Sequence, residues 1–158
     1  MEYNLFIIIL IIYLIGSVPF AFIITKLSGY GDIRNIGSGN VGSTNVLRTG
    51  NKFLAIIVLI FDILKGYIPS FFILNYLFNS NSNELIFYML GSMAIIGHLF
   101  PFWLKFKGGK GIATYIGFIF AVNYILGVFF VFLWLFIAFL TKYSSMASIF
   151  SLFAIPFL

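Results

Sequence analysis

The sequence predicts an all-α polytopic membrane protein, and its composition and the grouping of its apolar residues are the observations that predict it. Hydrophobic residues make up 62% of the chain, charged residues only 8%, and the mean hydropathy is +1.13, values outside the range of soluble domains. The apolar residues also form long runs without charge. About 20 such residues are what a helix needs to cross roughly 30 Å of hydrocarbon.

Three runs of at least this length lie between residues 5 and 104. Leu5 to Ile24 carries no charge over 20 residues, and Leu85 to Leu104 has the same length without Asp, Glu, Lys or Arg. Phe53 to Phe78 lies between them and is interrupted by one acid and one lysine. Each run predicts one membrane-spanning helix.

The fourth run, Ile112 to Leu140, is uncharged for 29 residues. A single helix of this length would measure about 43 Å at 1.5 Å per residue, more than the apolar thickness of a bilayer. Asn123 is the one strongly polar residue within it. We therefore expect a turn near Ala121–Tyr124 that separates a short helix from a longer one, with one tilted helix as the alternative.

The cations predict how the chain is oriented. Four lie between the first two runs and three follow the third, whereas the N-terminus and the Asn79–Glu84 loop contain none. Cytoplasmic loops are enriched in Lys and Arg. We therefore expect the N-terminus outside and both basic loops in the cytoplasm.

Cysteine is absent and histidine occurs once, which excludes disulfides, thiolate metal sites and a cysteine nucleophile. The four acids and one histidine offer little for a metal ion. We expect no metal, no cofactor and no nucleic-acid partner.

The first basic loop contains residues 37–48, GSGNVGSTNVLR, which match the GxGxxG template of dinucleotide-binding proteins. A membrane helix precedes it, so it is not a Rossmann turn, and Ser43 stands where a Walker loop needs lysine. Glycines allow backbone N–H groups to converge on an anion, and Arg48 offers a bidentate fork for phosphate. A flexible polar linker is the simpler alternative.

The second basic loop, residues 105–111 (KFKGGKG), places glycines around Lys110 at the start of the next helix. The positive end of the helix dipole favours an anion there. Contact with anionic lipid explains Lys105 and Lys107 equally well. Two such loops on one face suit a ligand with a phosphate at one end and an apolar chain at the other.

These two loops resemble motifs of the bacterial acyl-phosphate:glycerol-3-phosphate acyltransferases, the PlsY family. The same resemblance extends to Asp62-x-x-Lys65-Gly66, residues 97–101 (GHLFP) and residues 141–149 (TKYSSMASI). The resemblance covers essentially the whole chain. It implies a bundle of seven transmembrane helices in the full family fold, with about five and a partial sixth in this chain. It also implies transfer of a fatty acyl group from acyl phosphate to the 1-hydroxyl of glycerol 3-phosphate, giving lysophosphatidic acid and phosphate, in the bacterial cytoplasmic (inner) membrane.

The resemblance assigns roles residue by residue. The catalytic candidates are Ser38, Arg48 and Lys110. The substrate-binding candidates are Gly37, Gly39, Asn40, Gly42, Thr44, Asn45, His98, Lys105, Lys107, Gly108, Gly109 and Gly111. Partners would be acyl phosphate, glycerol 3-phosphate, membrane lipids and, functionally, an enzyme that forms acyl phosphate.

Several alternatives stay open. Ser38 is either a phosphate ligand or a nucleophile, and the ligand is favoured because no acid or histidine is near it in sequence. Asp62 and Lys65 are three residues apart on a helix and predict an intramembrane ion pair, or else a proton relay. His98 either bridges helices or touches substrate. An organic-phosphate transporter and a non-catalytic scaffold are the rival functions.

The resemblance also implies that 1–158 is a single acyltransferase domain whose C-terminal end is missing, because a family motif containing His-x-x-Asn is absent. Met146 to Leu158 is an apolar run of 13 residues, about 20 Å of helix, too short to span a bilayer. We expect it to be the first part of a sixth helix.

Overall fold

The structure is a computed structural model that describes residues 4–77 and 84–157. Its described residues form helices joined by turns and loops, with no strand among them. Four helical segments are long and apolar enough to cross a membrane, and two more, Ile112–Val122 and Ser144–Phe157, are apolar but shorter. The predicted membrane-spanning helical bundle is confirmed.

The first span consists of two helices, α1 (Leu5–Ser17) and α2 (Phe20–Leu27). The break falls at Pro19, which has no N–H to continue the helical hydrogen bonds. The chain therefore changes direction inside the first apolar run, where the sequence pattern predicts one continuous helix.

The next two spans are α4 (Lys52–Phe72), which continues as a π-helical turn (Ile73–Leu77), and α5 (Glu84–Leu99). A four-residue helix, α3 (Ser43–Val46), precedes α4 within the first basic loop. Most of the Asn79–Glu84 loop, which was used above to predict the orientation, lies outside the described residues, as does Glu2.

The long fourth run is divided as expected. Helix α6 (Ile112–Val122) ends one residue before Asn123, and α7 (Tyr124–Thr141) starts one residue after it. The Asn123 carboxamide oxygen accepts hydrogen bonds from the N–H groups of Ile125 (2.9 Å) and Leu126 (3.3 Å). An asparagine at this position satisfies free donors at the helix start, which is why the only strongly polar residue of the run marks its turn.

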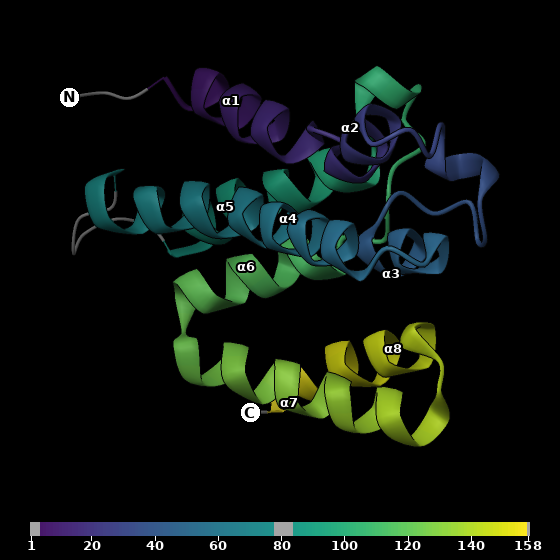
Figure 1. Cartoon of the computed structure of the whole chain (residues 1–158). Coiled ribbons are helices and arrows are strands. Elements are labelled where there is room, and N and C mark those ends of the chain that lie inside the picture. The colour runs from purple at the N-terminus through teal and green to yellow at the C-terminus, as the bar shows by residue number, and fades with distance from the viewer. Residues whose placement is uncertain (1–3, 78–83, 158) are drawn as a thin grey trace.

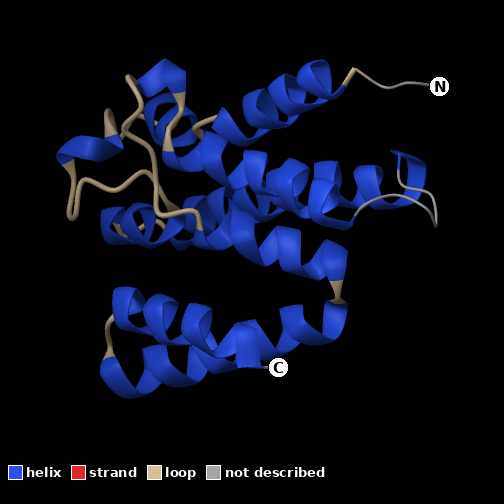
Figure 2. Cartoon of the chain, turned by 180° about the vertical axis from the view of Figure 1, so that it is seen from behind, coloured by secondary structure: helices blue, strands red, loops and turns tan. Residues whose placement is uncertain are grey.

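The last apolar run forms α8 (Ser144–Ala154) and a 3₁₀ turn (Ile155–Phe157). In Figure 1, α1, α4, α5 and α6 lie in one group and the α7–α8 hairpin lies beside it, joined through the turn after α6. Seen from behind, most of the loops gather at one end of the bundle (Figure 2). The two basic loops thus share that end.

Small residues bring two helix pairs into backbone contact. A Cβ placed on Gly66 of α4 would overlap the Thr114 carbonyl of α6, and one on Gly117 of α6 would overlap the Ile63 carbonyl of α4. Helices α1 and α5 meet in the same way at Gly16 and Ala94. Close approach of small residues is how helices associate where lipid removes the hydrophobic driving force.

Candidate active site

Asn45 organises the first basic loop. Its side chain is fully buried, and its amide nitrogen donates to the carbonyls of Ile33 (3.0 Å) and Ile36 (2.9 Å). Its oxygen accepts from the Ser38 N–H (2.9 Å) and the Ser38 hydroxyl (3.2 Å). These bonds use both donors and both acceptor positions of the amide. Asn45, proposed from sequence as a ligand, therefore holds the loop and orients Ser38.

Glycines let the same loop turn tightly around Arg48. Gly37 and Gly39 have φ values of 56° and 70°, a region that other residues rarely occupy. A Cβ on Gly37 would lie 2.7 Å from Arg48 Cδ, so the arginine stem lies directly on the glycine. Arg48 is exposed, and within the described chain its guanidinium has no hydrogen-bond or ion-pair partner.

Lys110 joins the second basic loop to the last helix. Its ammonium group donates to the Ser145 hydroxyl at 2.6 Å, and Ser145 lies in the first turn of α8. The two residues are 35 positions apart in the sequence, which explains why no local pattern indicates the contact.

A cavity of about 700 Å³ connects these groups. Its polar end contains Ser38, Asn40, Thr44, Arg48, Lys110 and Ser145. Its walls are apolar and come from three helices, with Ile56 and Leu59 of α4, Ile116 and Phe120 of α6, and Val131 and Leu135 of α7. The arrangement is amphiphilic, with cations and hydroxyls at one end and hydrocarbon along the rest.

The structure brings together most of the candidate residues predicted from the sequence. Those that line this cavity are Ser38, Asn40, Gly42, Thr44, Asn45, Arg48, His98, Lys110 and Gly111. Gly37 and Gly39 shape the loop behind them. Lys105 and Lys107 are exposed and do not line this cavity. Residues that the sequence assigned no role also line it, namely Lys52, Trp134, Ser144, Ser145 and Ser148.

Gly108 and Gly109 pack against α5 in this structure, whereas the sequence predicts that they form an open loop that binds an anion. Their N–H groups donate to the carbonyls of Leu99 and His98, each at 3.1 Å. A Cβ on Gly108 would overlap the His98 carbonyl, and one on Gly109 would overlap the His98 imidazole. In this structure their amides cap the end of α5, and the missing side chains allow the loop to pack against it.

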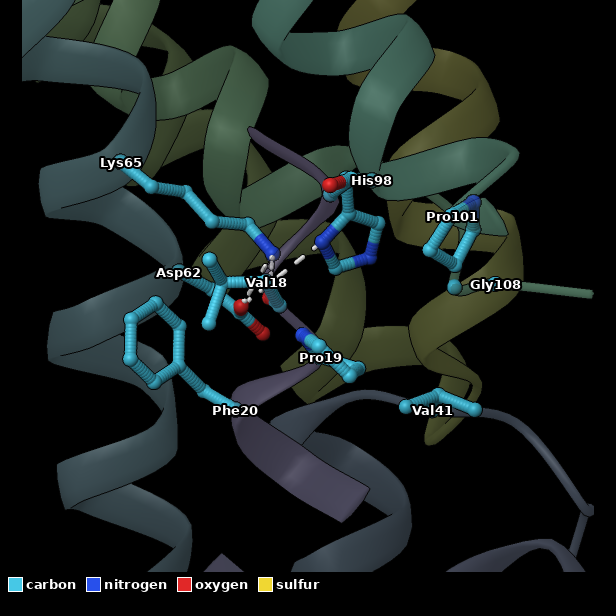
Figure 3. Close-up of a pocket in the computed structure, with 11 residues that line it drawn as sticks. Val18, Pro19, Phe20, Val41, Asp62, Lys65, His98, Pro101 and Gly108 are labelled. Atoms are coloured by element: carbon cyan, nitrogen blue, oxygen red, sulfur yellow. Dashed lines mark hydrogen bonds and ion pairs between the residues drawn. The ribbon is translucent and has the colours of Figure 1, made fainter. Parts of the chain in front are cut away.

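A buried polar cluster lies behind this loop (Figure 3). Asp62 and Lys65 are 2% and 4% exposed, and their charged groups are 2.9 Å apart, so the predicted ion pair is confirmed. Lys65 also donates to the Val18 carbonyl at 2.9 Å. His98 Nδ1 lies 3.7 Å from Asp62 Oδ1.

Asp32, the acid in the first basic loop, is occupied elsewhere. Its carboxylate accepts from Arg34 Nε at 3.0 Å and from Arg34 Nη2 at 2.6 Å. This hydrogen bonding holds the pKa of the Asp32 carboxyl below its usual value, which makes it a weaker base. Asp32 does not line the cavity.

The model of the glycerol-3-phosphate acyltransferase family matches residues 6–158 of the chain. A protein of that name from Bartonella henselae is 43% identical over 155 residues, which cover 98% of this chain and 73% of the relative. One from Allorhizobium ampelinum is 49% identical over 144 residues, covering 91% of this chain and 68% of the relative.

Two solved structures of PlsY (YgiH), an integral membrane glycerol 3-phosphate acyltransferase, have the same fold. Its glycerol 3-phosphate form superposes with a TM-score of 0.89 at 37% identity, over 97% of this chain and 74% of the other. The lysophosphatidic acid form gives 0.86 at 35% identity over the same shares.

Replacing Asn45 by Asp tests how the loop is held. The carboxylate keeps the shape but loses both donors and faces the carbonyls of Ile33 and Ile36, so we expect the loop to open at a cost of about 2–3 kcal/mol. Amide hydrogen exchange at residues 33–38 should accelerate strongly. The control is Asn40→Asp in the same loop, because the Asn40 side chain makes no hydrogen bond within the described chain. Equal exchange in both variants would contradict the assignment.

Proposed function

The chain belongs to the glycerol-3-phosphate acyltransferase family, and we propose that it acylates glycerol 3-phosphate with acyl phosphate as the donor, using the cavity between α4, α6 and α7. The amphiphilic form of that cavity is the observation that carries the proposal. An acyl phosphate has a phosphate for the cationic end and a chain for the apolar walls. In this proposal residues 1–158 belong to one catalytic domain.

The cations at the polar end explain how two phosphates can meet there. Arg48 provides a planar fork suited to phosphate oxygens, whereas Lys110 provides a point charge. Preorganised cations and donors oppose the repulsion between two anions and fix their relative orientation. Ser38 and Thr44 add hydroxyl donors on the same side of the cavity.

The transfer needs no acyl-enzyme intermediate. The glycerol 3-phosphate hydroxyl oxygen attacks the acyl carbonyl carbon, an ester bond forms, and the bond from that carbon to the phosphate oxygen breaks. The hydroxyl proton goes to a phosphate oxygen, because both nearby acids are engaged, Asp32 with Arg34 and Asp62 with Lys65. Ser38 serves as a ligand in this scheme, since its hydroxyl faces the Asn45 amide rather than a base.

We place the enzyme in the bacterial cytoplasmic membrane, with its N-terminus outside and both basic loops in the cytoplasm. The positive-inside bias supports this orientation, as does the position of the two loops at one end of the bundle (Figure 1). The donor would come from an enzyme that forms acyl phosphate, and surrounding lipids would contact the apolar helix faces.

Comparing acyl donors tests the proposal directly. Protein that contains residues 1–158, reconstituted in liposomes, should form lysophosphatidic acid from acyl phosphate, with one phosphate released per ester. Acyl-CoA and acyl carrier protein should not replace it, because neither offers a terminal acyl phosphate to the cationic end. Uptake of glycerol 3-phosphate without acylation would favour a transporter, and an acyl ester trapped on Ser38 would contradict direct transfer.

Arg48→Lys should lower kcat/KM about 10²-fold, because an ammonium group retains the charge but cannot form the guanidinium's paired hydrogen bonds. Steady-state kinetics in both substrates measures this. Arg34→Lys is the matched control, an arginine in the same loop that pairs with Asp32 outside the cavity. A near-normal Arg48→Lys enzyme would show that only the charge is needed.

Phe120 should limit the length of the acyl chain. Among the α6 residues that line the cavity it is the farthest from Lys110 in the sequence, about 12 Å along the helix from its first residue. Its ring also lies 2.7 Å from where a Cβ on Gly127 of α7 would be. Phe120→Ala should raise the preference for longer over shorter acyl phosphates about 10-fold in kcat/KM. Phe132→Ala on the exposed face of α7 is the control, and an unchanged profile in Phe120→Ala would place the chain elsewhere.

A further inference from the structure

The cluster of Asp62, Lys65 and His98 has no part in the transfer described above, although it is buried beside the second basic loop (Figure 3). We infer that His98 is a positioning residue for Lys110, acting through Gly109, and that the Asp62–Lys65 ion pair fixes His98. This inference rests on the proposed role of Lys110 at the polar end of the cavity.

The ion pair is anchored on two sides. Lys65 donates to the Val18 carbonyl, where α1 ends and the first span is broken. Its ammonium group also contacts Asp62 at 2.9 Å. A lysine held between an acid and a backbone carbonyl in a buried site has little freedom, so Asp62 presents its carboxylate to α5 in one position.

His98 lies between that carboxylate and the loop. Its Nδ1 lies 3.7 Å from Asp62 Oδ1, and its Nε2 side lies against Gly109, where even a methyl group would overlap the ring. The Val41 carbonyl of the first basic loop lies against the same face of Gly109, 2.6 Å from where a Cβ would be. Gly109 therefore packs closely against both the imidazole and the first loop.

Lys110 follows immediately in the chain. The backbone direction at Gly109 sets where the Lys110 side chain leaves the loop, and that side chain reaches Ser145 and the cavity. A misplacement of about 1 Å in a group that orients substrate can cost 10²-fold in rate. The His98 ring thus determines the direction of a cation with which it forms no hydrogen bond in the described part of the chain.

Burial favours this positioning role for His98 over a catalytic one. His98 is 6% exposed, and the space among His98, Asp62, Lys65 and Gly109 is a cavity of about 10 Å³, room for about one water molecule. His98 also reaches the wall of the large cavity, so direct contact with substrate is the alternative that the experiment must separate.

A double-mutant cycle between His98 and Lys110 makes that separation. His98→Ala should lower kcat/KM about 10²-fold in the otherwise unchanged enzyme. In the Lys110→Ala background the same change should have little further effect, because residues that act as a unit are not additive. His98→Gln, which keeps bulk beside Gly109, should recover part of the loss and supplies the cycle if His98→Ala does not fold.

Ile96→Ala, an exposed position on the same helix, is the matched control for insertion and stability and should leave kinetics unchanged in both backgrounds. If the loss of kcat/KM in the double variant equals the product of the two single losses, the inference is overturned and His98 contacts substrate independently of Lys110. A Lys110→Ala enzyme with normal activity would instead overturn the assignment of Lys110 itself. The two failures are therefore distinguishable.

Discussion

The buried ion pair on α4 is the interaction on which the rest of the site depends. Two charges in an apolar bundle are stable only when they are paired and hydrogen-bonded. Here they are paired with each other, and Lys65 also satisfies the Val18 carbonyl where the first span is interrupted. A broken helix within a membrane needs such a partner. The break in turn directs α2 toward the first basic loop. Asp62 lies next to His98, which packs against the second basic loop.

The polar end of the cavity has an unbalanced charge. Arg48, Lys52 and Lys110 line it, while Asp62, the one acid among its described lining residues, is already neutralised by Lys65. Asp32 is paired with Arg34 outside it. Charges that are not compensated within the protein are available to an anionic ligand. Keeping the acids engaged elsewhere is therefore as important to this site as supplying the cations.

Features with a local cause could be predicted from the sequence. The turn at Asn123 follows from one polar residue in an apolar run, and the Asp62–Lys65 pair follows from helical spacing. Proline often interrupts a helix, but the apolar run around Pro19 indicated a continuous helix, so the break there was not predicted.

Features that depend on distant partners could not be predicted in the same way. The sequence does not distinguish a glycine that makes room for an anion from one that makes room for a neighbouring helix. The packing of Gly108 and Gly109 against α5 could therefore not be predicted. Asn45 read as one polar residue among several, because its four hydrogen bonds join residues brought close only by folding. The contact of Lys110 with Ser145 has the same origin.

The backbone contact of α4 with α6 has a consequence for an enzyme surrounded by lipid. Bilayers differ in thickness, and helices respond to a mismatch chiefly by tilting. At Gly66 and Gly117 the two helices touch without intervening side chains, so one cannot tilt far without the other. Arg48 precedes α4 and Lys110 precedes α6, which ties their separation to this contact. The distance between the two cations is consequently buffered against changes in membrane composition.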